Sequence, residues 1–287
     1  MSSPATGPER PVSPIVTVYR PAGEGSGGSG WLRIQQIWAH RELAWRLLTR
    51  DLASSYRESI LGYLWALLPV LATTFTFAWL SSARIVTVGA TQLPYPLFVL
   101  INMTIWQYFA TGLSSLTTCL SATGYMITKV RFPREILLLV ALGQNMVDLL
   151  IRLVLVAVAL VMYRVVPPWT IVLMPLVAIP VSLLLLGWGF LLSIGNVLYR
   201  DVGRFTYLVL TFWMFLTPVL YPARIDRPLL NVANPISPFV IAAADLAAVG
   251  HLTQPVNFLI GCSVALASLI VGWLLFGLIE PYVIERI

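Results

Sequence analysis

ILLLVALGQNMVDLLIRLVLVAVALVMY, residues 136–163, is an apolar run that contains one acid, Asp148, and one base, Arg152. About 20 apolar residues at 1.5 Å of rise each are enough to cross the hydrocarbon core of a bilayer. The run therefore predicts a transmembrane helix. Asp148 and Arg152 are four residues apart, so a helix places them on one face, where an internal ion pair that fixes helix packing is favoured over a role in substrate passage.

The chain has five more apolar stretches. The complete set of predicted spans is Ile60–Ala83, Tyr95–Ser121, Ile136–Tyr163, Thr170–Leu198, Phe205–Leu220 and Val256–Ile279. The fifth is short, which suggests that it bends or re-enters. Hydrophobic residues make up 58% of the chain and charged residues 10%, whereas soluble domains have about 25% charged residues. We predict an all-α membrane protein with six transmembrane helices.

The basic residues are distributed unequally between the two sides of this arrangement. One side carries Arg10, Arg20, Arg33, Arg41, Arg46, Arg50, Arg57, Lys129, Arg131, Arg134, Arg200, Arg204 and Arg286. The other carries only Arg84, Arg164, Arg224 and Arg227. Because Lys and Arg remain on the cytoplasmic side, we expect a multi-pass protein of the cytoplasmic (inner) membrane with both termini in the cytoplasm. The net charge of +6 then faces anionic lipid and partner proteins, and no nucleic acid is expected as a partner.

The N-terminal part divides into a tail and a helix. Residues 1–30 lack the apolar core of a signal peptide and are rich in Gly, Ser and Pro, so we expect a disordered cytoplasmic tail. Residues 31–57 have apolar positions at near-helical spacing with arginines on other faces, which predicts an amphipathic helix in the membrane interface. Its candidate interface residues are Trp31, Trp38, Arg41, Arg46 and Arg50. Residues 58–287 form the transmembrane domain.

Several kinds of chemistry have no support in the sequence. The single lysine, Lys129, has no glycine-rich turn before it, so no P-loop is present. The two histidines, His40 and His251, belong to no pair at metal-ligand spacing. Most acids stand next to an arginine, as in Arg50-Asp51 and Arg200-Asp201, and are more typical of structural pairs than of catalytic groups. We therefore expect no catalytic residues, no metal site and no cofactor in this chain.

Short motifs in the loops carry the most specific information. They are RDLASSYRESILGYLWALLP at 50–69, ITKVRFPREIL at 127–137, NVLYRDV at 196–202, TPVLYP at 217–222 and NP at 234–235. In this order they resemble the membrane subunit of ABC-2 type polysaccharide exporters, the group that exports O-antigen, teichoic acid and mycobacterial galactan. The resemblance covers roughly Trp31 to Ile279. It departs at Leu138 and Leu139, where the family often has proline, and after Asn234-Pro235, where an arginine is missing.

The resemblance implies a homodimer that binds two ATP-binding cassette subunits, which bind ATP and Mg²⁺, and that exports a lipid-linked polysaccharide of the O-antigen or galactan type. A short, stiff loop is suited to receive the motion of such a partner, and Pro133 restricts the backbone of the second motif. The candidate ATPase-coupling residues are Tyr125, Ile127, Lys129, Arg131, Phe132, Pro133, Arg134 and Glu135, with Arg200, Asp201 and Arg204 as a second, smaller contact. The alternative for this loop is ordinary positive-inside anchoring.

Between the fifth and sixth spans the chain is broken by prolines, yet Phe239–Ala244 is apolar enough to enter the interface. The resemblance implies re-entrant outer segments beside the exit; simple surface packing is the alternative. The candidate outer-gate residues are Thr217, Pro218, Tyr221, Pro222, Asn234 and Pro235.

Aromatic residues are frequent in the spans, and sugars stack on aromatic rings, although many of these rings must face lipid. The candidate channel-lining residues are Tyr63, Trp65, Phe75, Trp106, Tyr108, Phe109, Phe212 and Phe215. Three other functions remain open: an ABC-2 exporter of lipid or drug, a membrane-embedded transferase acting on lipid-linked sugar, and a passive channel or scramblase.

Overall fold

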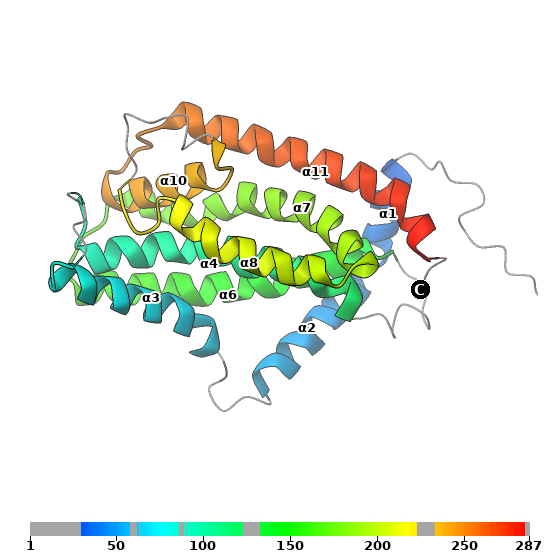
Figure 1. Ribbon diagram of the computed structural model, residues 1–287, viewed down its shortest axis with the longest axis horizontal. Helices are drawn as coiled ribbons and strands as arrows, with labels where there is room; N and C mark the ends of the chain where they lie inside the picture. Colours follow the sequence, from blue (N-terminus) through cyan, green and yellow to red (C-terminus); the bar gives the residue numbers. More distant parts are fainter. Residues whose placement is uncertain are drawn as a thin grey trace, which may run out of the picture.

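The computed structural model describes residues 30–57, 62, 64–85, 89, 91–122, 133–222 and 233–284, and within these ranges all regular structure is helical. The elements are α1 (Gly30–Ala39), α2 (Arg41–Arg57), α3 (Leu64–Ser82), α4 (Tyr95–Ala122), α6 (Glu135–Met162), the 3₁₀ helix η1 (Trp169–Val177), α7 (Ala178–Leu198), α8 (Asp201–Leu216), α10 (Ser237–Ala248) and α11 (Pro255–Ile284). The long helices run roughly side by side (Figure 1). Residues 1–29 of the predicted tail lie outside the described ranges.

Five helical segments in the described part of the chain are long and apolar enough to cross a membrane: α3, α4, α6, η1 together with α7, and α11. They correspond to five of the six predicted spans. The predicted fifth span, 205–220, is the 16-residue helix α8. The helix starts earlier than the apolar pattern suggests, at Asp201. It also ends sooner, because Pro218 disfavours a helical conformation at Thr217, which is extended with φ −95° and ψ 140°.

The predicted fourth span begins with a 3₁₀ turn. The chain is extended at Pro168, winds as η1 from Trp169 to Val177 and continues as α7 from Ala178. Pro175 lies inside η1 and has no N–H to donate. Short 3₁₀ segments are common at the start of α-helices. The membrane-spanning unit is therefore a composite of two helix types.

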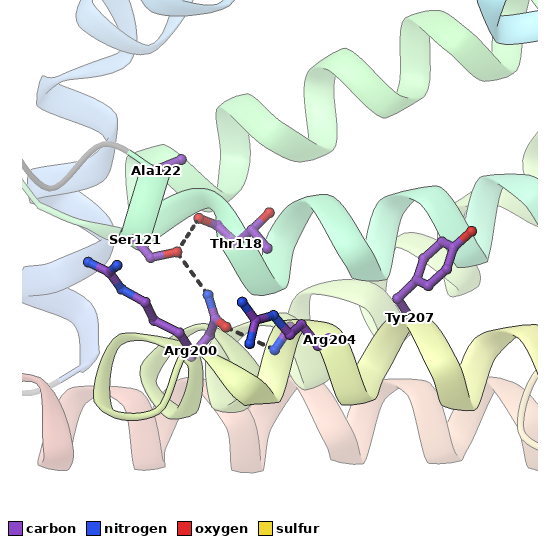
Figure 2. A pocket seen from close by; sticks show the side chains of 8 residues that line it. Thr118, Ser121, Ala122, Arg200, Arg204 and Tyr207 are labelled. Atoms are coloured by element: carbon purple, nitrogen blue, oxygen red, sulfur yellow. Dashed lines mark hydrogen bonds between the residues drawn. The ribbon is translucent and has the colours of Figure 1, made fainter.

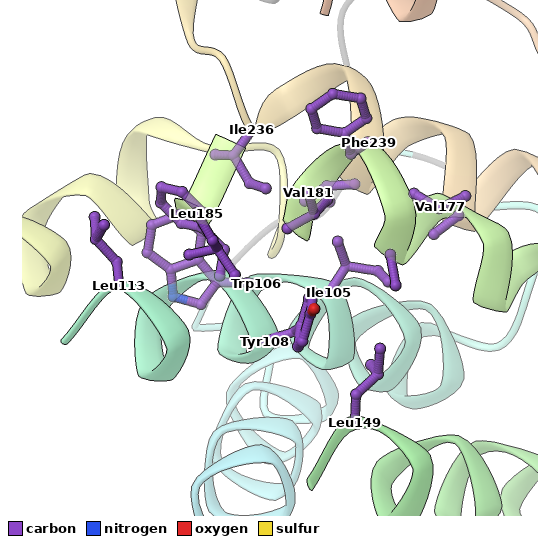
Figure 3. Packing of buried hydrophobic residues seen from close by; sticks show 14 of the residues in the cluster. Ile105, Trp106, Tyr108, Leu113, Leu149, Val177, Val181, Leu185, Ile236 and Phe239 are labelled. Atoms are coloured by element: carbon purple, nitrogen blue, oxygen red, sulfur yellow. The ribbon is translucent and has the colours of Figure 1, made fainter. Parts of the chain in front are cut away.

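Helix α4 lies at the centre of the bundle. It packs against α3, α6, α7, α8 and α10. Its buried face meets α7 and α6 (Figure 3), where Tyr108 lies in one cluster with Val181 and Leu149. The Tyr108 hydroxyl shares a hydrogen bond of 2.6 Å with Ser182 Oγ, and Asn145 Nδ2 donates to the Tyr108 carbonyl at 2.7 Å. These polar contacts fix the packing of three spans in an interior where dispersion alone would allow sliding.

α3 and α11 lie at the periphery. Val70 is the only residue that α3 buries among those described, and most of α11 is also exposed. Arg152 of α6, which is almost fully buried, donates from Nε to the carbonyl of Ala66 in the first turn of α3 at 3.1 Å. An arginine inside a span is costly to bury unless it is bonded in this way, so it holds α3 against α6.

The predicted interface helix is divided into two. α1 ends at Ala39 and α2 begins at Arg41, with a turn at His40, whose ring Nδ1 lies 2.8 Å from the Gln36 carbonyl. α2 packs against α6. α1 lies near the last turns of α11 (Figure 1). We call this end of the bundle, which carries Arg33, Arg134, Arg200 and Arg204, the basic end.

Candidate functional site

A groove of about 540 Å³ opens at the basic end, between the last turns of α4 and the first turns of α8 (Figure 2). Its wall contains small polar side chains from α4, an amide from α7, and basic and aromatic side chains from the start of α8. The lining residues are Thr118, Ser121, Ala122, Asn196, Arg200, Gly203, Arg204 and Tyr207. None of these eight residues is acidic.

The turn between α7 and α8 determines which side chains reach the groove. α7 ends at Leu198 because Tyr199 is extended, with φ −138° and ψ 106°, and α8 begins at Asp201. Arg200, Arg204 and Tyr207 are spaced by four and three residues, so they share one face of α8. Figure 2 shows this face turned toward Thr118 and Ser121 of α4.

Asn196 links the three helices beneath the groove. Its Oδ1 accepts a hydrogen bond from the Gly203 N–H at 2.9 Å, and its Nδ2 donates to Ser121 Oγ at 2.8 Å. Ser121 Oγ in turn donates to the Thr118 carbonyl at 2.9 Å. Gly203 allows this close approach, since a Cβ there would lie 2.9 Å from Asn196 Oδ1. The floor of the groove is thus fixed by bonds within the protein.

The charge around the groove is positive. Arg204 Nη1 lies 3.1 Å from Asp201 Oδ1, and both side chains are largely exposed. Arg200 is exposed next to them. Two guanidinium groups against one carboxylate leave a net positive charge, and the N-terminus of α8 adds a partial positive charge. The groove therefore favours an anion.

The structure describes only part of the predicted coupling segment. Tyr125, Ile127, Lys129, Arg131 and Phe132 lie outside the described residues. Pro133 and Arg134 lead into α6, which begins at Glu135: the Ile136 N–H donates to the Pro133 carbonyl at 3.2 Å, and the Leu137 N–H donates to the Arg134 carbonyl at 3.0 Å. Glu135 is buried. The segment leaves α4 at Ala122, in the wall of the groove.

The predicted gate residues meet at the opposite end of the bundle. Asn234 Nδ2 donates to Thr217 Oγ1 at 2.9 Å, and Thr217 Oγ1 donates to the Trp213 carbonyl at 3.0 Å. Two residues that the sequence motifs do not include also reach this turn. Asn102 of α4 has its Nδ2 3.3 Å from the Val219 carbonyl, and the Tyr95 hydroxyl donates to the Leu220 carbonyl at 3.0 Å. A polar amide inside an apolar span could have indicated Asn102.

The rest of the gate set lies in the same turn or next to it. Tyr221 donates from its hydroxyl to the Phe215 carbonyl at 3.1 Å. Pro218, Pro222 and Pro235 follow Thr217, Tyr221 and Asn234 directly in the chain. α10, which comes next, is buried against η1, α4 and α11. Phe239–Ala244 is thus packed among other helices, and its re-entry into the membrane stays a prediction beside the alternative of simple surface packing.

The predicted channel-lining aromatics separate into two groups. Trp106, Tyr108 and Phe109 are 2%, 0% and 0% exposed, so they belong to the core and not to a channel wall. Phe109 packs there against Trp188 and Trp213, with ring centroids 6.2 and 5.8 Å away. Four others are more than half exposed, namely Trp65, Phe75, Phe212 and Phe215. Tyr63 lies outside the described residues. Aromatic content alone cannot separate the groups, because the difference depends on which helix face meets a neighbour.

The candidate interface residues are mostly exposed. Trp38 is exposed and carries Arg41 over its ring, at 5.4 Å from the centroid. Arg46 pairs with Glu42 at 2.6 Å, and Arg50 with Asp51 at 2.7 Å. The side chain of Trp31 lies outside the described residues. Within the described part of the chain, no group of three or more His, Cys, Asp or Glu residues could hold a metal ion.

Comparison with known proteins agrees with the motifs. The model of the family described as ABC-2 type transporter matches residues 42–246. The chain is similar to the O-antigen export system permease protein RfbA of Myxococcus xanthus, at 30% identity over 209 residues that cover 71% of this chain and 79% of that protein. It is also similar to the O-antigen export system permease protein RfbA of Klebsiella pneumoniae, at 26% identity over 208 residues, covering 70% and 78% of the two chains.

Proposed function

The chain belongs to the ABC-2 type transporter family, and on that premise we propose that it is the membrane subunit of an ATP-driven exporter of lipid-linked polysaccharide. The substrate is of the O-antigen or galactan type and crosses the cytoplasmic membrane. The observation that carries the proposal is the similarity to an O-antigen export permease over 79% of that protein's length. ATP and Mg²⁺ are bound by a separate ATPase, of which two copies serve one homodimer.

The proposed topology has six crossings with both termini in the cytoplasm. α8 supplies the fifth crossing in chain order, since it leads from the basic end, where α7 stops, toward the end where α10 and the start of α11 lie (Figure 1). At about 1.5 Å per residue, its 16 residues extend for roughly 24 Å. The basic end then faces the cytoplasm, in line with the retention of Arg and Lys on that side.

The proposed channel lies between two copies of the chain. Trp65 and Phe75 of α3, and Phe212 and Phe215 of α8, give these two helices exposed aromatic faces. Such rings can stack on sugars, while α3 also packs on α4 and α6, and α8 on α4 and α7. α10 and the turn at Thr217 serve as the outer gate, in a re-entrant arrangement that protein contacts satisfy.

The proposed route for energy is the segment from Tyr125 to Glu135. Its cationic residues suit pairing with acids on the ATPase. Its C-terminal end is suited to transmit a displacement, because Glu135, Ile136 and Leu138 are buried at the start of α6. A push on this segment would move α6 as a rigid body.

Co-purification with the partner ATPase, followed by ATPase stimulation and transport of a lipid-linked glycan into inverted vesicles, tests the proposal. Replacing Lys129, Arg131 and Arg134 together by Gln should abolish coupled export. Replacing Arg84 and Arg164 by Gln, at the opposite end, is the control and should not. Export that survives the triple replacement, or glycan flux without ATP, would contradict the proposal. Turnover without an ATPase would instead indicate a transferase.

A further inference from the structure

We propose that the groove between α4 and α8 binds the phosphate-bearing headgroup of the transported lipid, with Arg200 and Arg204 as the phosphate ligands. This inference rests on the proposed function, and it names the place where the substrate is first held at the cytoplasmic surface. It also assigns the two arginines to the substrate, whereas the sequence pattern placed them in a minor ATPase contact.

The two arginines are suited to phosphate. A guanidinium group presents a planar fork of N–H donors that binds phosphate oxygens in pairs. Arg200 and Arg204 are four residues apart, so they are separated by about 6 Å along α8, a distance at which both can reach a diphosphate. They stand at the positive end of the α8 dipole. Basic pockets between transmembrane helices on the cytoplasmic side are sites where lipid headgroups bind.

The floor of the groove is preorganised by hydrogen bonds within the protein. Asn196 bonds to Gly203 of α8 and to Ser121 of α4 at 2.9 and 2.8 Å, so the floor of the groove is already ordered. A preorganised site loses less entropy on binding. The groove is open to its surroundings, and its volume of about 540 Å³ leaves room for a sugar next to the phosphates.

The face of α8 that carries the arginines continues into the membrane. Tyr207, Thr211 and Phe215 follow Arg204 at spacings of three, four and four residues, and all three are exposed. These positions lie on one stripe of the helix. A headgroup held at Arg200 and Arg204 would therefore place its first sugars along hydroxyl and aromatic groups that lead to the proposed channel.

The Asp201 carboxylate competes with a phosphate for Arg204. Both side chains of this ion pair are exposed, and exposed ion pairs are weak. A phosphate can therefore displace the carboxylate. The groove also borders Ala122, the last residue of α4 before the proposed coupling segment, so that a bound headgroup would act directly on that end of α4.

The experiment uses the complex with its ATPase in phosphatidylcholine nanodiscs, and the probe is a polyprenyl diphosphate without glycan. Its dissociation constant is measured by native mass spectrometry. R200Q/R204Q should weaken binding at least tenfold, and R200K/R204K should restore part of it. D201N should tighten binding about threefold, which a folding defect could not do. R84Q/R164Q removes the same charge at the opposite end and should change binding less than twofold.

Other outcomes overturn the inference. If R200Q/R204Q releases the ATPase while wild type retains it, the arginines are docking contacts and the proposed function still stands. If phosphatidylglycerol at the same mole fraction displaces the probe, the groove binds bilayer phospholipid and not the substrate headgroup. If free inorganic diphosphate competes as well as the lipid, the groove does not select a lipid headgroup. Should no ATPase bind even to wild type, the proposed function fails, and probe binding to the chain alone still tests the groove.

Discussion

Arg33 Nη2 donates a hydrogen bond to the backbone carbonyl of Gly277 at 2.9 Å and so joins α1 to the last turns of α11. The carbonyl is available because the residue four positions later is Pro281, which has no N–H to close the helical bond. A Cβ at Gly277 would overlap the Arg33 guanidinium. The glycine and the proline together create an acceptor site that an arginine from the other end of the chain fills.

Replacing Gly277 by Ala or Arg33 by Met should therefore detach α1 in the same way. Each change should lower the stability of α1 docking by about 1 kcal/mol, the typical value of one hydrogen bond. Together they should cost no more than either alone, because both remove the same contact. Hydrogen exchange of the α1 amides measures this. R41Q is the control and should leave α1 docked, since Arg41 stacks on Trp38. If the losses of docking stability from the two single variants added up in the double variant, Arg33 and Gly277 would not share one contact.

Gly187 and Gly272 should be the least tolerant positions between α7 and α11. A Cβ on Gly187 would overlap the backbone of Ser268, and one on Gly272 would overlap the carbonyl of Gly187. G187A should destabilise the protein by about 2 kcal/mol or more, as overpacking does. G195A in the same helix is the matched control, because its Cβ would meet Val202 at an ordinary 3.6 Å. Thermal unfolding followed by circular dichroism measures both, and equal midpoints would contradict the close approach.

The sequence predicts the long helices well, and it does so for a clear reason. Apolar length is a property of each segment, so α4 and α6 match their predicted spans to within one residue at each end. α8 was predicted less well because the apolar run continues past Pro218, which ends the helix. The groove could not be predicted: Ser121 and Asn196 are 75 residues apart and meet only because α4 packs against α7.

The two groups of aromatic residues should respond differently to truncation. F109A removes a ring that is packed against Trp188 and Trp213, and it should cost about 3–5 kcal/mol of stability. F212A removes a ring that is 63% exposed, so it should change protomer stability by less than about 0.5 kcal/mol and slow glycan export instead. Unfolding midpoints and vesicle transport separate the two effects. Normal export by F212A would remove Phe212 from the channel.

The turn at Thr217 should control the outer exit through Asn234. Asn234 is buried, donates to Thr217 Oγ1 at 2.9 Å and accepts from the Ile236 N–H at 3.3 Å, so one side chain joins the end of α8 to the segment that enters α10. N234A leaves these buried groups without their partner, at a cost of about 1–3 kcal/mol. We expect the turn to open more often and the vesicles to leak a small labelled sugar in the absence of ATP.

N234D keeps the acceptor for Ile236 but loses the donor to Thr217, so its leak should be intermediate. N257A removes an amide contact to Gln254 of 2.7 Å near the start of α11 and serves as the control, with no leak expected. A tight N234A vesicle with a lowered unfolding midpoint would show that Asn234 stabilises the fold without holding the exit closed.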